Sequence, residues 1–474
     1  MRCLSRSLLR CGSFLSAIVA VSGVICRADT GSVPNPLEKY ISAPDASFTW
    51  KRIGDKGGFA NIEFTSQTWH GIPWRHQLSV FGEPDTIPNA PALLFISGSS
   101  AKPEDFEFLK RVSERAHIVV ALLSDVPNEP LFDGKSEDAL LAYSFDQYTR
   151  TGDDSWPVLF PMVKSVMRAM DVITDFTHGT VKTFLVSGAS KRGWTSYLVG
   201  AVDSRVVGIA PRVFEMINIR AQIDWAQKVY GAQSEKLQAY TDLALPARLA
   251  SDRKLQELRA WIDPYEYRAR LKMPKLLQLG TNDRYWVVDS ARWYWDDLLA
   301  PKAMSQVPNH GHHLDPESLR PIAAWAEILA AGKEFPEISW DFVKTEAGVD
   351  IRVKNTVAPN ASGLWKACAV TRDMREASWR GSPITPGPDA KTVTVPIPVP
   401  AEKLGHCAYF VRENFATPSG LQFDLSTGII VLPELPEAPV AKVRRHPKTA
   451  MPAESTPSHP LVATPSQSAT PAAR

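Results

Sequence analysis

The chain has 474 residues, of which 44% are hydrophobic and 22% are charged. This length predicts more than one folded unit, and this balance is typical of a globular protein with a large core. The formal net charge of +2 gives no electrostatic reason to bind a polyanion, so no nucleic-acid partner is expected.

The N-terminal residues have the order of a secretory signal. Three arginines precede an apolar run at residues 14–25, and Ala28 supplies a small residue for cleavage. The run is shorter than the roughly 20 residues that span a bilayer. We expect residues 1–28 to be removed on export to the periplasm or the extracellular space, with no stable membrane insertion afterwards. An uncleaved anchor is the alternative.

Residues 90–330 alternate between short apolar runs and helical patterns. The runs that predict strands buried on both faces are 91–98, 117–124, 183–188 and 275–280. Apolar residues at three- and four-residue steps predict an amphipathic helix at 163–173. This alternation indicates an α/β fold with a mostly parallel sheet, to which residues 59–64 and 76–80 add antiparallel strands.

Composition divides the chain further. The predicted segments are a signal peptide (1–28), an α/β domain (29–335), a β-sandwich domain (336–432) and a disordered tail (433–474). An insert at about 209–271, rich in Trp, Tyr and Arg, predicts a helical cap. Short strands between Gly, Pro and Asn turns favour a sandwich of the immunoglobulin or fibronectin III type. The Pro/Ser/Thr-rich tail has too few large apolar residues to fold.

Cys368 and Cys407 are the two cysteines that would remain after removal of the signal. An even pair in an exported chain predicts one disulfide, with two separate thiols as the alternative. Neither cysteine lies near the candidate nucleophile described next, so neither a thiol nucleophile nor a Cys-rich zinc site is expected.

Ser190 has the surroundings of a catalytic nucleophile. The strand 183–188 ends at Gly188, one residue precedes Ser190, and Gly193 begins a stretch compatible with a helix. Such a tight strand-to-helix turn, the nucleophile elbow, pushes a serine hydroxyl clear of the backbone and needs small neighbours. The match is imperfect because the second glycine follows the serine by three residues instead of two.

A serine nucleophile needs a histidine base and an acid that orients this histidine. In α/β-hydrolases both follow the serine along the chain, and the acid precedes the histidine. Asp283 follows the strand 275–280, at the strand end where such sheets place their sites. Asp289 is a rival acid, but it is expected to N-cap a helix at 290–299.

Three histidines, His310, His312 and His313, lie together in a glycine-containing loop further on. Their order and placement suit the catalytic base, and the residues by themselves leave the choice among the three open. Three close histidines also admit a metal site, but no His-Glu-x-x-His pattern accompanies them. Neither a metal nor another cofactor is predicted.

The oxyanion hole should combine the backbone N–H of Lys191 with one from Ser99, in the Gly/Ser loop after the first buried strand. Two cationic residues, Lys191 and Arg192, directly follow the candidate nucleophile. One hypothesis is that they bind an anionic group of the substrate or the oxyanion. The alternative is a salt bridge to a neighbouring helix.

Several spaced motifs over roughly residues 35–430 resemble the PhoPQ-activated pathogenicity-related protein family. They are Glu137-Asp-Ala139, Trp156-Pro157, Gly188-Ala-Ser-Lys-Arg-Gly-Trp-Thr195, Gly280-Thr-Asn-Asp283, Tyr294-Trp-Asp-Asp297 and Val307-Pro-Asn-x-Gly-His312. The resemblance implies a secreted α/β-hydrolase, and it assigns the histidine of the last motif, His312, as the base. The family takes its name from a bacterial virulence regulon, which implies a link to virulence but supplies no substrate.

Two functions from different classes follow. The first is a secreted serine hydrolase, esterase-like or peptidase-like, in which Ser190, Asp283 and His312 form the triad. Its substrate would be an unidentified ester or amide, and its oligomeric state is left open. The second is a catalytically silent binding or signalling protein that keeps the fold. The complete set of triad residues favours the enzyme.

Overall fold

The computed structural model describes residues 35–82, 89–98, 102–385 and 391–435. The predicted signal peptide, the oxyanion candidate Ser99 and residues 436–474 of the predicted tail lie outside these ranges. The described residues up to Pro433 belong to one compact unit. Within the described ranges, each helix is too short or insufficiently apolar to cross a membrane.

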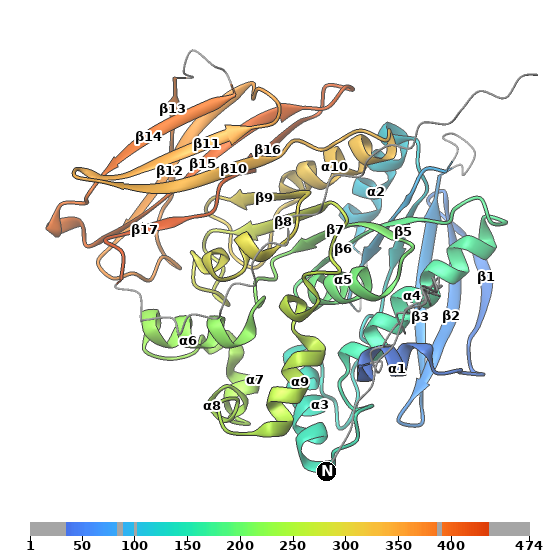
Figure 1. Cartoon of the computed structure of the whole chain (residues 1–474). Coiled ribbons are helices and arrows are strands. Elements are labelled where there is room, and N and C mark those ends of the chain that lie inside the picture. The colour runs from blue at the N-terminus through green and yellow to red at the C-terminus, as the bar shows by residue number, and fades with distance from the viewer. Residues whose placement is uncertain (1–34, 83–88, 99–101, 386–390, 436–474) are drawn as a thin grey trace, which may run out of the picture. The chain divides into compact units, whose positions relative to one another are not determined.

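A nine-stranded mixed sheet runs through the α/β region in the order β1-β2-β3-β5-β4-β6-β7-β8-β9 (Figure 1). Its strands are β1 (Thr49–Lys56), β2 (Phe59–Trp69), β3 (Ile72–Phe81), β4 (Ala92–Ile96), β5 (Val120–Leu123), β6 (Phe184–Ala189), β7 (Val206–Arg212), β8 (Lys275–Gly280) and β9 (Lys302–Val307). The pairs β1–β2, β2–β3 and β3–β5 are antiparallel. The remaining pairs, β5–β4, β4–β6, β6–β7, β7–β8 and β8–β9, are parallel. The carboxyl ends of the parallel strands therefore share one edge, where such sheets place their sites.

The predicted α/β fold is confirmed, since all six apolar or alternating runs form strands of this sheet. Three strands of the sheet were not predicted. Most residues of β1 are polar, Gly208 and Pro211 interrupt the apolar run of β7, and polar residues interrupt that of β9. In β9, Ser305 and Gln306 are nonetheless buried. The predicted start of the cap at Ile209 is wrong, because Ile209 lies in the middle of β7 and the insert follows Arg212.

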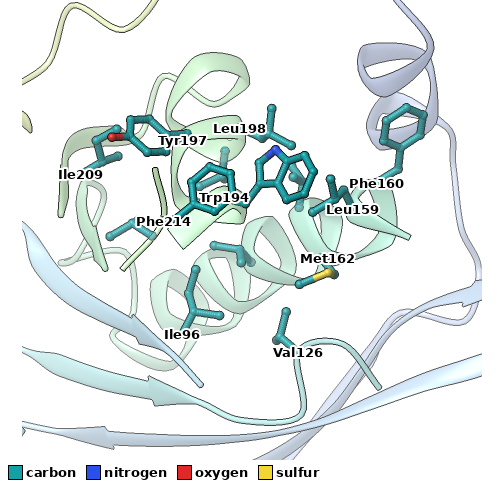
Figure 2. Close-up of a cluster of buried hydrophobic side chains, with 14 of the residues drawn as sticks. Ile96, Val126, Leu159, Phe160, Met162, Trp194, Tyr197, Leu198, Ile209 and Phe214 are labelled. Atoms are coloured by element: carbon teal, nitrogen blue, oxygen red, sulfur yellow. The ribbon is translucent and has the colours of Figure 1, made fainter. Parts of the chain in front are cut away.

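Each face of the sheet has its own hydrophobic cluster, as the two-residue period of a strand requires. In β4, Leu94 and Ile96 belong to one cluster, and Leu93 and Phe95 to the other. Helices α4 (Leu159–Phe176) and α5 (Lys191–Val202) contribute to the first cluster, and α2 (Pro103–Ala116) and α10 (Arg320–Ala330) to the second. Figure 2 shows part of the first cluster, in which Trp194 and Phe214 stack with ring centroids 5.0 Å apart.

Helices also fill the insert between β7 and β8. They are α6 (Ile219–Tyr230), α7 (Gln238–Thr241), α8 (Leu245–Arg248) and α9 (Arg253–Ile262). Both α7 and α9 contact α3 (Glu137–Thr151), and α9 also contacts the first helix, α1 (Pro36–Ser42) (Figure 1).

The residues after Phe335 form two antiparallel sheets. The strands are β10 (Ile338–Thr345), β11 (Gly348–Asn355), β12 (Ala361–Ala369), β13 (Arg380–Ile384), β14 (Thr392–Pro398), β15 (His406–Ala416), β16 (Gln422–Ser426) and β17 (Ile430–Leu432). One sheet has the order β10-β11-β14, and the other β13-β12-β15-β16, with β17 also paired to β15. The predicted disulfide is present, and it joins Cys368 to Cys407 on the neighbouring strands β12 and β15.

The two C-terminal sheets share the second hydrophobic cluster with the α/β region. That cluster continues from Leu93 and Trp325 to Ile351 and Val411. At the same junction, the backbone N–H of Gln306 donates to the Ser426 hydroxyl at 2.9 Å. A division into separate domains after residue 335, and the immunoglobulin or fibronectin III type of the sandwich, stay predictions.

Candidate active site

Ser190 lies at the turn between β6 and α5 with φ 57° and ψ −126°. A non-glycine residue rarely adopts this backbone conformation, which costs about 1–3 kcal/mol and marks functional sites when the surroundings hold it in place. Here the backbone N–H of Ser190 donates to the carbonyl of Arg212 at 2.9 Å, which ties the turn to the next strand. The backbone geometry is therefore that of a nucleophile elbow.

The two glycines of the turn are needed for close packing. A Cβ atom on Gly188 would lie 2.7 Å from the carbonyl oxygen of Arg192. One on Gly193 would lie 3.0 Å from the carbonyl oxygen of Arg212 and 3.1 Å from that of Gly188. The glycine three residues after Ser190 thus lets α5 approach β7 and the preceding strand.

Asp283 and His312 meet in the loops that follow β8 and β9. Nδ1 of His312 donates to a carboxylate oxygen of Asp283 at 2.8 Å, and the Tyr285 backbone N–H donates to the other oxygen at 2.9 Å. The loops approach closely at Gly280, where a Cβ atom would overlap the carbonyl oxygens of His310 and Gly311. Nε2 of His312 is buried and has no hydrogen-bond partner among the described residues.

The neighbouring histidines are placed differently. His310 contacts the Pro308 carbonyl at 2.9 Å through Nδ1 and Asp315 at 3.1 Å through Nε2, while His313 is exposed. Of the three candidates, His312 is the one that the structure pairs with Asp283. In the part of the chain that the structure describes, no group of three or more His, Cys, Asp or Glu side chains is arranged to hold a metal ion.

Asp289, the rival acid, has another role than the predicted N-cap. Its side chain makes no capping hydrogen bond, and the segment after it is a short 3-10 helix, Ser290–Trp293. The buried carboxylate instead pairs with the Arg372 guanidinium at 2.5 Å and accepts a hydrogen bond from the Trp225 indole at 2.8 Å. The expected cap is therefore wrong, because a buried arginine from the C-terminal region takes up the carboxylate.

The buried side chains of Lys191 and Arg192 belong to an ion cluster around Glu137, whose own side chain is half exposed. The Lys191 ammonium pairs with Glu137, at the start of α3, and lies 3.6 Å from Asp138. The Arg192 guanidinium bonds both oxygens of Glu137 at 3.0 Å and lies 3.2 Å from Glu129. The structure thus favours the alternative interpretation, a salt bridge to a neighbouring helix.

The cluster shifts the pKa values of its two glutamates in opposite directions. Burial opposes ionisation of Glu137, but the nearby charges of Arg192 and Lys191 outweigh it and lower its pKa to about 2. Burial raises the pKa of Glu129, and the neighbouring carboxylate of Glu137 adds to this effect. Glu137 is therefore the carboxylate that balances the two cations.

Of the two predicted oxyanion donors, the Lys191 backbone N–H lies within the described residues. Lys191 is the first residue of α5, and the first N–H groups of a helix have no partner within it and carry its positive dipole end. The second candidate, Ser99, lies outside the described residues. The preceding Gly98 packs against Arg192, since a Cβ atom on Gly98 would lie 2.6 Å from a guanidinium nitrogen.

Ser190 lines a partly open cavity of about 110 Å³. Tyr285 lines the same cavity, and its ring centroid lies 4.2 Å from that of His312. The Tyr285 hydroxyl donates to Asp138 at 2.9 Å, which fixes the ring between the ion cluster and the histidine. Sequence reasoning missed Tyr285, although it follows the quoted Gly-Thr-Asn-Asp motif by two residues.

The loops of Asp283 and His312 are also fastened to the segment that follows β12. The Asn282 amide donates to the Ala377 carbonyl at 2.7 Å. The Asn309 side chain accepts from the Trp379 N–H at 2.7 Å and donates to the Trp379 carbonyl at 3.0 Å. Both asparagines belong to motifs that sequence analysis singled out, but their partners lie about 70 to 95 positions further along the chain.

A mixed sheet with a strained serine at a strand-to-helix turn, and an acid and a histidine in the loops after later strands, defines the α/β-hydrolase fold. Within that class, the chain belongs to the PhoPQ-activated pathogenicity-related protein family, whose model matches residues 37–375.

The chain is also similar to individual proteins, at low sequence identity. Autocrine proliferation repressor protein A of Dictyostelium discoideum is 29% identical over 343 residues, which cover 66% of this chain and 68% of that protein. Acetyl xylan esterase 1 from a Thermoanaerobacterium species is 16% identical with a TM-score of 0.41, over 60% of this chain and 91% of that one. Acylaminoacyl peptidase from Pyrococcus horikoshii is 11% identical with a TM-score of 0.39, over 58% and 41% of the two chains.

Proposed function

We propose that this protein is an exported serine hydrolase that cleaves an ester or amide by acyl transfer. The observation that carries the proposal is the 2.8 Å hydrogen bond between Asp283 and His312, which leaves Nε2 of the histidine buried and without a partner in the described ranges. A buried, unpartnered nitrogen is costly unless a substrate or a serine hydroxyl uses it. Ser190 lines the cavity whose wall includes Tyr285, the residue packed on His312.

Each group has a defined task in the proposed reaction. The Ser190 hydroxyl attacks the substrate carbonyl while Nε2 of His312 accepts its proton, and Asp283 stabilises the resulting imidazolium. The Lys191 backbone N–H at the start of α5, with an N–H from the loop after β4, would hold the oxyanion. The imidazolium then gives its proton to the departing alcohol or amine, which leaves an acyl-serine. Water, deprotonated by His312, releases the acid and restores Ser190.

The ion cluster around Glu137 would position the nucleophile rather than touch the substrate. Lys191 and Arg192 follow Ser190 directly, and their cations are held by carboxylates on α3 and before it. The cluster therefore fixes the first turn of α5 and supports the strained backbone of Ser190.

A fluorophosphonate probe, which reacts with activated serines, tests the proposal on the purified protein. We expect labelling of the wild type, and loss of labelling and of ester hydrolysis by at least about a thousandfold in Ser190→Ala and His312→Ala. His313→Ala is the matched control, because this exposed neighbour should keep full reactivity. An unlabelled but well-folded wild type, or a His313→Ala variant as inactive as His312→Ala, would contradict the proposal.

The second candidate is a signalling protein that uses this fold without turnover, which the name of the Dictyostelium relative favours. In that case any effect on cells should survive the Ser190→Ala substitution unchanged. An effect that disappears together with probe labelling would assign it to the hydrolase.

A further inference from the structure

The cavity beside Ser190 is lined by apolar side chains from two parts of the chain. One wall comes from α3 and α5, through Leu141, Phe145 and Trp194. The other comes from the helical insert, through Ile223 of α6 and Leu255 and Leu258 of α9. Protein cores are close-packed and leave few voids larger than a water molecule. An unfilled space of about 110 Å³ that reaches Ser190 therefore differs from an ordinary close-packed core.

The charged groups at the cavity are already paired. Asp138 lies 3.6 Å from the Lys191 ammonium and accepts hydrogen bonds from the hydroxyls of Tyr240 at 3.2 Å and Tyr285 at 2.9 Å. Arg259 pairs with Glu266 at 2.5 Å and lies 3.6 Å from Asp263. A charged substituent would thus have to compete with existing partners, whereas an uncharged apolar one loses only its contact with water.

We infer that this cavity binds an uncharged apolar group of the substrate, either an alkyl chain or an aromatic ring, next to the bond that Ser190 cleaves. The inference rests on the proposed hydrolase function and narrows its substrate class. Apolar side chains predominate in its lining, as they do in small-molecule sites in general. Each methylene buried there should raise kcat/KM about fourfold until the cavity is full.

The first experiment measures kcat/KM for two ester series with the full-length enzyme. In p-nitrophenyl esters from acetate to octanoate the acyl chain grows, and in alkyl acetates from ethyl to octyl the alcohol grows. A rise in either series supports the inference and tells whether the cavity takes the acyl group or the leaving group. Flat profiles in both series of an active enzyme would overturn the inference while leaving the hydrolase function intact.

A pair of variants on α6 ties the selectivity to this cavity. Ile223→Trp fills space at the cavity wall, and Gln227→Trp adds the same bulk one turn later at an exposed position. We expect Ile223→Trp to lower kcat/KM for the octyl member of the rising series at least tenfold and to change that for the shortest member less than twofold. The Gln227→Trp variant should match the wild type. Equal losses for short and long substrates would contradict the assignment.

A binding measurement separates this inference from the proposed chemistry. The neutral fluorophore N-phenyl-1-naphthylamine should bind the Ser190→Ala protein, and the added Ile223→Trp substitution should weaken binding at least tenfold while Gln227→Trp does not. That result would support the apolar site even if no ester were hydrolysed. Absence of binding, or binding that the cavity substitution leaves unchanged, would overturn it.

Discussion

Ser190 combines a strained backbone with the position that a nucleophile needs. Its φ of 57° and ψ of −126° place the side chain at the tip of the turn between β6 and α5. Any side chain other than that of glycine is disfavoured in this conformation, so the strain persists because the neighbouring strand and the ion cluster hold the turn. The backbone conformation that suits a nucleophile at this position therefore lowers the stability of the folded protein.

Replacing Ser190 tests this opposition. We expect the free energy of unfolding of Ser190→Gly to be about 1 kcal/mol higher than that of Ser190→Ala, because glycine adopts a positive φ without a Cβ penalty. Both variants lack the hydroxyl, so its loss does not enter the comparison. Urea denaturation at neutral pH measures the difference. Equal unfolding free energies would mean that the turn is not strained in solution.

A second residue-scale effect concerns His76, which is fully buried between two serines. Its Nε2 lies 2.9 Å from the Ser66 hydroxyl and 3.0 Å from that of Ser165. Burial disfavours the charged ring and lowers the pKa of His76 to about 4. The unfolded chain therefore binds a proton at a higher pH than the folded protein does, and stability must fall as the pH falls from about 6.5 towards 4.

This dependence predicts a loss of about 3 kcal/mol from the free energy of unfolding between pH 7 and pH 4. Stability curves at several pH values should show this component in the wild type and in the His313→Gln control, whose ring is exposed. His76→Gln should lack it, whatever its stability at pH 7. A variant with the same pH dependence as the wild type would contradict the assigned cause.

At the scale of elements, the loops after β8 and β9 depend on the segment that follows β12. Asn309 has a φ of 60°, a conformation that asparagine tolerates better than most residues. Its side chain forms a pair of hydrogen bonds with the backbone of Trp379. Asn282 adds the bond to Ala377, so residues 374–379 hold the loop of Asp283 and the loop of His312 in one frame.

We expect Asn309→Ala to reduce kcat by tens of fold and KM by little, because it would shift the proposed catalytic histidine, His312, without removing substrate contacts. It should also cost about 2 kcal/mol of stability for the two hydrogen bonds lost. Steady-state kinetics and urea unfolding measure both effects. Asn360→Ala, whose amide contacts exposed Gln422, is the matched control and should change neither. A change in KM alone would assign Asn309 to substrate binding instead.

At the scale of the whole molecule, the described part of the chain up to Pro433 is held together by more than one kind of link. The second hydrophobic cluster runs from the central sheet into both C-terminal sheets, and the Arg372–Asp289 pair crosses the same junction. The disulfide closes a span of 39 residues within one C-terminal sheet, next to the segment that holds the loops of Asp283 and His312.

Removal of the disulfide should therefore affect the α/β region as well. We expect the double substitution Cys368→Ser and Cys407→Ser to lower the free energy of unfolding by about 2–4 kcal/mol, through the greater freedom of the unfolded chain. Calorimetry should show one transition that moves as a whole. Two transitions, of which only one moves, would instead establish the predicted separate domain after residue 335.

Short-range sequence patterns by themselves determined much of the fold and of the candidate site. Continuous apolar runs indicated β4, β5, β6 and β8, because strands buried on both faces need them. The glycines around Ser190 indicated the elbow, since backbone geometry there excludes larger residues. Strand β1 was missed because most of its residues are polar, and β7 because Gly208 and Pro211 break its apolar run. Strand β9 was missed because its polar residues Ser305 and Gln306 are buried.

Contacts between distant segments were decided only by the tertiary structure. The local pattern left three histidines open, and the pairing with Asp283 depends on how two loops pack at Gly280. Asp289 looked like a cap because its partner, Arg372, lies 83 residues away. The ion cluster and the cavity likewise combine side chains from separate helices. A sequence encodes such contacts through the whole fold, so local periodicity and spacing carry no signal for them.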